Sequence, residues 1–359
     1  MKVVITGPTG AIGMALIQKC IERDIPVLAI CHRESTRIRQ LPKHPLVTVM
    51  QIDLSEYEAY AQMCEADATK DEKDKNGKLL RAWSSQNGRI EPENPTQKEN
   101  TIFIHLAWNG TTGESRNDTA LQLQNIKHTL DAVRLAKALS CDTFIGAGSQ
   151  AEYGKVEGNI TPQTPTFPQM GYGIAKLCAG QMSRLLCSQL GIRHIWTRIL
   201  SVYGPYDGQQ AMLPTLISKL AKGEKMPLTK GEQIWDYLYS VDAADAILAL
   251  AKNGKDGRVY CLGSGVGKPL RSYIEECAKA VWEYRTKNDR DQREREASES
   301  FEEFVQSYIG FGEIAYHPQQ TMHLCADITA LREDTGYVPD TEFTKGIRET
   351  VEANLQKKE

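Results

Sequence analysis

The sequence predicts an α/β fold built on a doubly wound parallel sheet. Two observations indicate it: short apolar runs alternate with longer segments of helical periodicity between residues 2 and 204, and glycines cluster in the turn after the first apolar run. Because parallel strands need crossover connections, this alternation predicts helices on both faces of one sheet.

Each element has its own signal in the sequence. Continuous apolar or β-branched runs, typical of strands buried on both faces, lie at 2–6, 25–32, 46–54, 101–108, 142–149 and 192–204. Apolar residues recur at helical spacing in 11–23, 123–140 and 171–190. In chain order, these segments predict a strand–helix alternation that ends with one long strand over 192–204.

Two polar segments interrupt the pattern. Residues 67–100 are rich in lysine, asparagine and glutamate and lack apolar periodicity, which predicts a partly disordered surface insertion. In 285–304 charges of both signs alternate, which favours an exposed helix face, with a mobile flap as the alternative. After residue 204 the alternation loosens. We therefore expect a sheet domain over 1–204 and, over 205–359, mainly a smaller α/β substrate lobe from which some segments return to the main sheet.

Composition excludes several classes of function. The chain has 359 residues and a net charge of −3, so it lacks the basic excess of a nucleic-acid-binding protein. It contains no apolar run long enough to span a membrane, and a first strand starting near residue 3 leaves no room for a signal peptide. The nine cysteines form no C-x-x-C pair and the seven histidines show no ligand spacing. We expect a cytoplasmic protein with reduced thiols and no metal.

The turn after the first strand carries the first functional signal. Gly7, Gly10 and Gly13 stand between an apolar run and a helical segment. In that position glycines allow a tight turn, close approach of a pyrophosphate and close packing of helix on sheet, while the helix N-terminus attracts the anion. This context favours a Rossmann-type dinucleotide site over a plain turn.

The end of the second strand bears on the choice of cofactor. Sites that prefer NAD often place an acid there for the ribose 2′-hydroxyl, but CHREST places Arg33 at that position and Arg37 nearby. A guanidinium binds a 2′-phosphate that a carboxylate would repel, so the sequence favours NADP over NAD. The alternative is that both arginines are simply exposed.

A second constellation predicts proton transfer. Tyr172 and Lys176 are spaced Y-x-x-x-K within a helical segment and so lie on one face. A phenol is a poor proton relay at neutral pH unless a neighbouring cation stabilises its phenolate. Ser149 ends the strand at 142–149, at the carboxyl edge where such sheets hold ligands, and can hydrogen-bond the same substrate oxygen.

Together these motifs resemble the extended short-chain dehydrogenase/reductases, the NAD-dependent epimerase/dehydratase family that modifies nucleotide sugars. HLAWNG, RILSVYGP, DYLYSVDAADAI and GYVPDTEFTKGIRETV follow in family order. The resemblance implies a homodimer formed through the helices at 123–140 and 171–190, and Ser149, Tyr172 and Lys176 as catalytic residues. It implies cofactor contacts at Gly7, Thr9, Gly10, Ala11, Ile12, Gly13, Arg33, Asp53, Leu54, Leu106, Ala107, Trp108, Asn125, Tyr172 and Lys176.

Departures from the family pattern narrow the choice among the family's reactions. Related 4,6-dehydratases carry an Asp-Glu pair directly after the Ser/Thr, where this chain has Gln150 and Ala151, so dehydration is disfavoured. Galactose-type epimerases carry an asparagine at Ser201 and a pyrophosphate-binding arginine at Trp235. Trp235 either stacks on the substrate or is partly buried packing. We expect substrate contacts at Ser149, Gln150, Ser201 and Trp235.

Three functions remain in view. With Arg33, the departures favour an NADP-dependent reductase of 4-keto-deoxysugar nucleotides, with hydride transfer at a sugar carbon, C4 in the family's usual chemistry. An NAD-retaining nucleotide-sugar 4-epimerase is the first alternative, and a non-catalytic dinucleotide sensor is the second.

Overall fold

The computed structural model describes residues 1–65, 75–86, 100–288, 299–318 and 320–356. Its central element is a seven-stranded sheet, ordered β11-β6-β5-β4-β1-β2-β3, in which all neighbouring strands are parallel. The strands are β1 (Lys2–Thr6), β2 (Val27–Cys31), β3 (Val47–Gln51), β4 (Thr101–His105), β5 (Thr143–Ser149), β6 (Arg193–Ile199) and β11 (Arg258–Leu262). The strand order reverses between β1 and β4, which confirms the predicted doubly wound fold.

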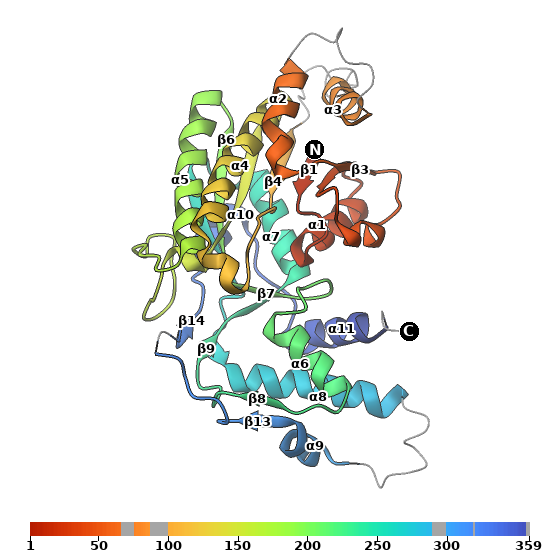
Figure 1. Cartoon of the computed structure of the whole chain (residues 1–359), viewed down its shortest axis with the longest axis vertical. Helices are drawn as coiled ribbons and strands as arrows, with labels where there is room; N and C mark the ends of the chain where they lie inside the picture. The colour runs from red at the N-terminus through yellow and green to blue at the C-terminus, as the bar shows by residue number, and fades with distance from the viewer. Residues whose placement is uncertain (66–74, 87–99, 289–298, 319, 357–359) are drawn as a thin grey trace.

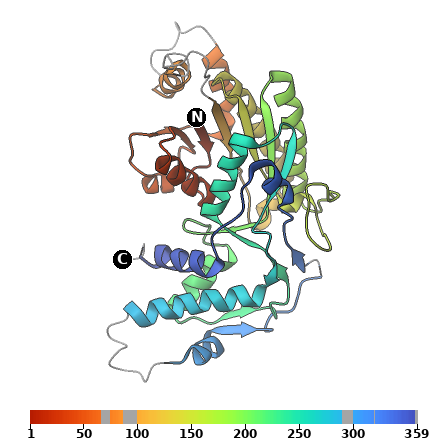
Figure 2. The same cartoon turned by 180° about the vertical axis from the view of Figure 1, so that it is seen from behind.

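Helices cover both faces of the sheet (Figures 1 and 2). One face carries α1 (Ala11–Glu22) and α7 (Ser240–Asn253), and the other carries α2 (Tyr57–Glu65), α4 (Thr119–Ala138) and α5 (Gly171–Leu190). Successive strand residues alternate between the two cores: Val3 and Ile5 pack with α1 and α7, whereas Val4 packs with α2 and α4. Burial on both faces explains why these strands are continuous apolar runs.

Two local features fix the helices that carry the site. The Asp118 side chain accepts a hydrogen bond from the backbone N–H of Leu121 at 3.1 Å and so caps the start of α4. At the other end of the pair, α5 stops where Gly191 adopts a left-handed conformation with φ of 68°. The helices α4 and α5 lie side by side in Figure 1 and pack against each other.

The strand predicted over 192–204 is in fact two strands. After β6 the chain leaves the main sheet, and β7 (Ser201–Tyr203) pairs in parallel with β10 (Tyr237–Tyr239). At the junction of β6 and β7, the Leu200 N–H donates to the carbonyl of Leu262 at 2.9 Å. The apolar run is continuous in sequence, and a change of hydrogen-bonding partner leaves no mark on it.

The predicted polar insertion contains a helix that the sequence analysis missed. Lys75–Gln86 form α3, whose Leu80 is fully buried and whose Trp83 is 8% exposed in the core on the α2 side of the sheet. The expectation of a partly disordered surface insertion included no helix, and in these residues the segment is helical and partly buried. Residues 66–74 and 87–99 lie outside the described part of the chain. The two buried side chains stand three apart, too few to register as a periodic pattern in a polar context.

The second polar segment begins and ends in helices. The helix α8 extends to Asn288, and α9 (Phe301–Tyr308) starts with a capping box in which the Ser300 hydroxyl accepts from the Glu303 N–H at 3.2 Å. Residues 289–298, which make up half of this segment, lie outside the described part of the chain. The choice between an exposed helix face and a mobile flap therefore stays open for them.

The C-terminal half builds a smaller lobe, at the bottom of Figure 1, and also contributes to the main sheet. The lobe has its own apolar core of helices and short strands. Its elements are α6 (Met212–Ala221), β8 (Met226–Leu228), β9 (Ile234–Trp235), β12 (Lys268–Pro269), α8 (Leu270–Asn288), α9, β13 (Ile309–Phe311), β14 (His323–Leu324) and α11 (Phe343–Gln356). The helix α7, strand β11 and helix α10 (Thr329–Thr335) pack with the sheet domain. A division at residue 204 stays a prediction.

No helix within the described residues is both long and apolar enough to cross a bilayer.

Candidate active site at the carboxyl edge of the sheet

The glycine turn between β1 and α1 has two glycines that the protein itself requires. Gly7 has φ of 68°, and a Cβ on it would lie 2.9 Å from the backbone nitrogen of Ala107. A Cβ on Gly13 would lie 2.5 Å from the carbonyl oxygen of Gly7. Gly10 differs, because a Cβ there would meet only that same oxygen, at 3.7 Å. The space over Gly10 is therefore open, and packing within the chain does not explain this glycine.

The start of α1 offers hydrogen-bond donors to an anion. No side chain caps this helix, and no acidic residue stands in its first turn, which begins at Ala11 and Ile12. The first N–H groups of a helix have no partner within the helix and carry the positive end of its dipole. With the open space over Gly10, this turn fits the pyrophosphate of a dinucleotide. Thr9 lies in the same turn, and Leu106 and Ala107 follow β4, the strand next to β1.

The two arginines after β2 are both engaged. Arg33 donates from Nε and Nη2 to the two carboxylate oxygens of Glu56, at 2.9 and 2.7 Å. Arg37 donates to the backbone carbonyl of Tyr206, which lies beyond β7. The sequence analysis favoured both cations as partners of a 2′-phosphate, with simple exposure of the two arginines as the alternative. In the structure, a carboxylate already neutralises Arg33, and the Arg37 guanidinium bridges to the second half of the chain.

Several other predicted cofactor residues support the walls of the site through hydrogen bonds. The Asp53 carboxylate accepts the Arg33 N–H at 2.9 Å, and Leu54 directly follows in the 3-10 turn Leu54–Glu56. The buried Asn125 amide accepts the N–H of Asn109 at 3.0 Å and donates to its carbonyl at 2.8 Å. Asn125 thus fixes the loop after β4, and its described hydrogen bonds are made within the chain.

Ser149, Tyr172 and Lys176 come together at the carboxyl edge, and Trp108 contacts the last two. The Trp108 and Tyr172 rings meet edge to face with centroids 6.1 Å apart. The Lys176 Nζ lies 3.7 Å from the Trp108 ring centroid and donates to the Ala147 carbonyl at 2.6 Å. Ser149 ends β5, two residues after Ala147. A cation–π contact and one carbonyl thus hold the lysine beneath the site.

Burial shifts the pKa of both titratable groups against the charged form. The pKa of Tyr172 is raised by burial, while the Ser149 hydroxyl and the Arg116 charge act in the opposite direction. The pKa of Lys176 is lowered by burial to about 7, with the distant Glu152 charge opposing the shift. The lysine is therefore only partly charged at neutral pH before a ligand binds.

One charged neighbour of Tyr172 was not predicted. The Arg116 guanidinium lies over the phenol ring with its Cζ 4.6 Å from the centroid. Arg116 belongs to the 3-10 turn Gly113–Asn117, which follows the loop after β4. A lone arginine in an irregular loop carries no periodicity and no motif, so nothing in the residue order marked it.

A buried carboxylate lies directly behind Ser149. Glu152 accepts hydrogen bonds from the Ser149 N–H at 2.8 Å, from Trp196 Nε1 at 3.0 Å and from Arg198 Nε at 2.7 Å. A Cβ at Gly148 would lie 2.3 Å from the same carboxylate, so that glycine makes room for it. The Glu152 carboxylate thus accepts hydrogen bonds from three groups of the chain itself. The residues between it and Ser149, Gln150 and Ala151, are not acids.

The two substrate positions predicted in the second half of the chain bond to each other. Trp235 donates from Nε1 to the Ser201 hydroxyl at 2.9 Å. Trp235 is half-buried and packs against the apolar core of the lobe as well as a smaller cluster under the loop after η4 (Gln150–Glu152). The indole is therefore partly buried packing, one of the two alternatives that the sequence left open, and its stacking on a substrate stays a prediction.

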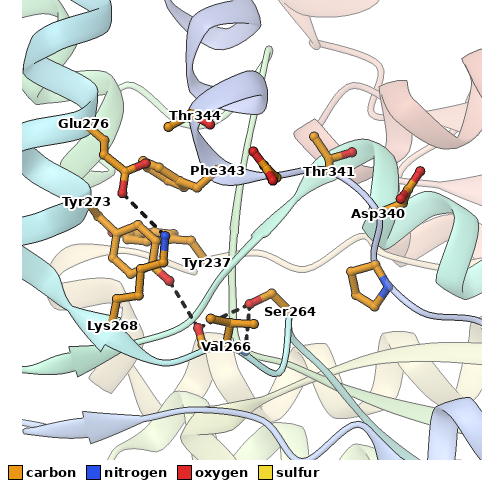
Figure 3. A pocket seen from close by; sticks show the side chains of 12 residues that line it. Tyr237, Ser264, Val266, Lys268, Tyr273, Glu276, Asp340, Thr341, Phe343 and Thr344 are labelled. Carbon is orange, nitrogen blue, oxygen red and sulfur yellow. Dashed lines mark hydrogen bonds and ion pairs between the residues drawn. The ribbon is translucent and has the colours of Figure 1, made fainter.

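A separate cavity of about 450 Å³ lies in the lobe between α8, α11 and the loop after β11 (Figure 3). Lys268 pairs with Glu276 at 3.5 Å, and the Tyr273 hydroxyl donates to the Val266 carbonyl at 3.2 Å. The second carboxylate oxygen of Glu276, Oε2, is buried without a hydrogen-bond partner. None of the predicted site residues lines this cavity. The candidate active site therefore stays at the edge of the main sheet.

Comparison with known proteins agrees with this geometry. A family model described as the NAD dependent epimerase/dehydratase family matches residues 93–263. A dTDP-glucose 4,6-dehydratase of Xanthomonas campestris pv. campestris is 24% identical over 212 residues, which cover 58% of this chain and 56% of that protein. The match thus spans little more than half of the dehydratase. A dTDP-4-dehydro-6-deoxyglucose reductase of Escherichia coli is 25% identical over 279 residues, covering 76% of this chain and 79% of the reductase.

Solved structures share the fold over the whole chain. A UDP-N-acetylglucosamine 4-epimerase from Methanobrevibacter ruminantium, in complex with UDP-N-acetylmuramic acid, superposes with a TM-score of 0.74 at 20% identity, covering 99% of this chain and 98% of the epimerase. The Thermus thermophilus UDP-glucose 4-epimerase in complex with NAD also gives 0.74, at 17% identity and 99% coverage of both chains. At identities of 20% and 17%, this likeness shows a shared fold alone.

Proposed function

We propose that this chain belongs to the NAD-dependent epimerase/dehydratase family, whose model matches residues 93–263, and that it is a nucleotide-sugar reductase that converts a 4-keto-deoxysugar nucleotide to the alcohol with NADPH. The observation that supports this proposal is the convergence at one sheet edge of an open glycine turn with Ser149, Tyr172 and Lys176. A dinucleotide on the turn and a proton donor at the same edge are what a carbonyl reduction needs.

The proposed chemistry divides between the cofactor and the chain. The cofactor supplies a hydride from its nicotinamide ring to the carbonyl carbon. Tyr172 donates its phenolic proton to the carbonyl oxygen, and the Ser149 hydroxyl holds that oxygen in place. Lys176 stabilises the phenolate that remains, and the phenol regains a proton from solvent after the alcohol leaves.

The residues that follow Ser149 favour reduction over dehydration. Loss of water from the sugar needs an acid and a base beside the reacting carbons, and Gln150 and Ala151 provide neither. Glu152 is a carboxylate, but three hydrogen-bond donors hold it behind the serine. The similarity to the Escherichia coli reductase, which covers more than three quarters of both chains, agrees with this choice.

The preference for NADPH rests on Arg33. Its pair with Glu56 is exposed to solvent, and exposed ion pairs contribute little to stability. A doubly charged 2′-phosphate can therefore compete with Glu56 for the guanidinium in a bidentate geometry. NAD(H) is the alternative, and it would leave the Arg33–Glu56 pair intact.

The test is an assay of cofactor oxidation. The purified chain is mixed with a nucleotide-linked 4-keto-6-deoxysugar and NADPH or NADH, and absorbance of the reduced cofactor is followed. We expect steady oxidation, faster with NADPH, and a loss of about 100-fold or more in kcat for Tyr172→Phe because the proton donor is gone. Tyr284→Phe on α8 is the matched control and should keep full turnover.

Other outcomes would favour the alternatives. Interconversion of two nucleotide sugars without net cofactor oxidation would indicate the 4-epimerase. Tight binding of the dinucleotide with neither reaction, over a panel of nucleotide sugars, would indicate a sensor. Turnover that survives Tyr172→Phe would mean that the proton donor lies elsewhere.

A further inference from the structure

We propose that Arg116 is a positioning residue for Tyr172, a fixed cation stacked on the phenol ring that favours the phenolate formed when the tyrosine gives up its proton. This inference rests on the proposed function, because it assigns Arg116 a part in the same proton transfer. No sequence motif of the chain predicts this contact between Arg116 and Tyr172.

In the described structure, the guanidinium of Arg116 makes a cation–π contact with Tyr172 and no side-chain hydrogen bond or ion pair. Its Cζ lies 4.6 Å from the Tyr172 ring centroid, and its Nε is buried without a hydrogen-bond partner. Among the described residues, no carboxylate pairs with it and no carbonyl accepts from its side chain. A buried nitrogen without a partner is costly, so its contact with the ring face must compensate for part of that cost.

The backbone on both sides of Arg116 is fixed against the two helices of the site. The Asn117 side chain accepts the Gly171 N–H at 3.0 Å, which ties the turn to the start of α5. The Ser115 carbonyl accepts from Gln122 Nε2 at 2.9 Å, which ties it to α4. A Cβ at Gly171 would lie 3.0 Å from the Arg116 carbonyl oxygen, so the close approach of this turn depends on that glycine. The arginine is therefore held over the tyrosine by its surroundings.

The other charged groups near Tyr172 leave room for this role. Lys176, one turn along α5, has its Nζ 5.8 Å from the phenol ring, and burial lowers its pKa to about 7. Glu152, behind Ser149, acts in the opposite sense and raises the pKa of Tyr172. An arginine stays protonated at any pH at which the chain is folded. Arg116 thus places a guanidinium directly over the phenol ring, closer to the ring centroid than the amine of Lys176.

The experiment measures the acidity of Tyr172 without substrate or cofactor. The full chain is labelled with 3-fluorotyrosine, whose phenol is more acidic than that of tyrosine, and titrated by ¹⁹F NMR. The Tyr172 signal is identified by its absence in Tyr172→Phe. We expect Arg116→Gln and Arg116→Met to raise the pKa of Tyr172 by about one unit, as for a charge at this distance, and Arg116→Lys to raise it less.

Arg184→Gln is the matched control, because it removes the same charge from α5 three turns away and should leave the Tyr172 signal unchanged. Unshifted signals from the other tyrosines report that each variant is folded, and any one folded Arg116 variant without charge decides the matter. If such a variant titrates with the wild type, Arg116 plays no part in the acidity of Tyr172 and the inference is wrong.

A kinetic readout separates this inference from the proposed function. In the NADPH assay, the pH dependence of kcat for Arg116→Gln should move toward higher pH by the same amount, with KM unchanged. A shifted titration together with an inactive wild-type chain would leave the electrostatic coupling intact and overturn the proposed function. Turnover with an unshifted titration would overturn the role of Arg116 alone.

Discussion

At the scale of single residues, Lys176 stands out because the fold buries an amine without a carboxylate beside it. Its partners are the Trp108 ring and the Ala147 carbonyl, both of which are uncharged. An ammonium in such a place loses hydration that neutral partners only partly replace. In the proposed function, a bound dinucleotide would supply further hydrogen-bond partners for this amine.

This burial predicts a pH-dependent stability for the ligand-free chain. The pKa of Lys176 is about 7 in the folded protein and 10.5 in its ordinary state. Between these values the unfolded chain binds a proton that the folded chain does not, so the free energy of unfolding must rise with pH in this window. The slope from this group is at most about 1.4 kcal/mol per pH unit.

Lys176→Met removes that contribution. We expect its melting temperature to exceed that of the wild type at pH 7 and the difference to shrink toward pH 9, measured by calorimetry without cofactor. Using the difference between the two proteins cancels the titration of the buried cysteines, which they share. If the difference in melting temperature stays constant from pH 7 to pH 9, burial does not lower the pKa of Lys176.

At the scale of elements, α3 shows how a polar segment can still contribute to the core. Its Leu80 and Trp83 pack in the cluster that also contains Leu28 and Met50 of β2 and β3. The Asn76 side chain donates to the carbonyl of Gln51 at 2.9 Å, at the end of β3. The helix thus covers the outer part of the sheet, where β3 is the edge strand.

Removing one of these apolar contacts should destabilise the whole domain. Leu80→Ala is expected to lower the free energy of unfolding by roughly 2–4 kcal/mol, because it deletes a fully buried side chain and leaves a cavity. Chemical denaturation measures the change. Lys78→Ala, an exposed position on the same helix, is the control and should cost well under 1 kcal/mol. Equal effects of the two would mean that α3 does not pack on the sheet.

At the scale of the whole molecule, the outer surface of α4 and α5 is unusually apolar. Ile174, Met182 and Leu185 are 53%, 44% and 57% exposed and recur at helical spacing along α5, and Leu123 of α4 is 67% exposed. Large apolar side chains in such a stripe are typical of a surface that another chain covers. We expect a homodimer formed through these helices, in agreement with what the family resemblance implies.

A charge in the stripe tests the dimer. The wild-type chain should elute and scatter light as a particle of twice 40.1 kDa, and Leu185→Asp should yield a folded particle of 40.1 kDa because an unpaired carboxylate is costly in an apolar interface. Val338→Asp, an equally exposed apolar position elsewhere, is the control and should remain dimeric. A monomeric wild type would overturn the expectation.

The sequence by itself determined the architecture and the main chemical groups of this protein. Strands buried on both faces must be continuous apolar runs, and a tight turn from strand to helix must use glycine at Gly7 and Gly13, so both features appear directly in the order of residues. The spacing of Tyr172 and Lys176 on one helix is equally local. For these features the physical constraint acts within a few neighbouring residues.

Only the tertiary structure decided how these groups are partnered. Glu56 neutralises Arg33 from 23 residues away, Trp235 bonds Ser201 across two short sheets, and Arg116 reaches Tyr172 from a loop between other elements. Such contacts depend on where the fold brings distant segments, and a single side chain in a loop carries no periodic signal. The same reason hid the departure of β7 from the main sheet, because the choice of strand partner is a property of the whole sheet rather than of the strand.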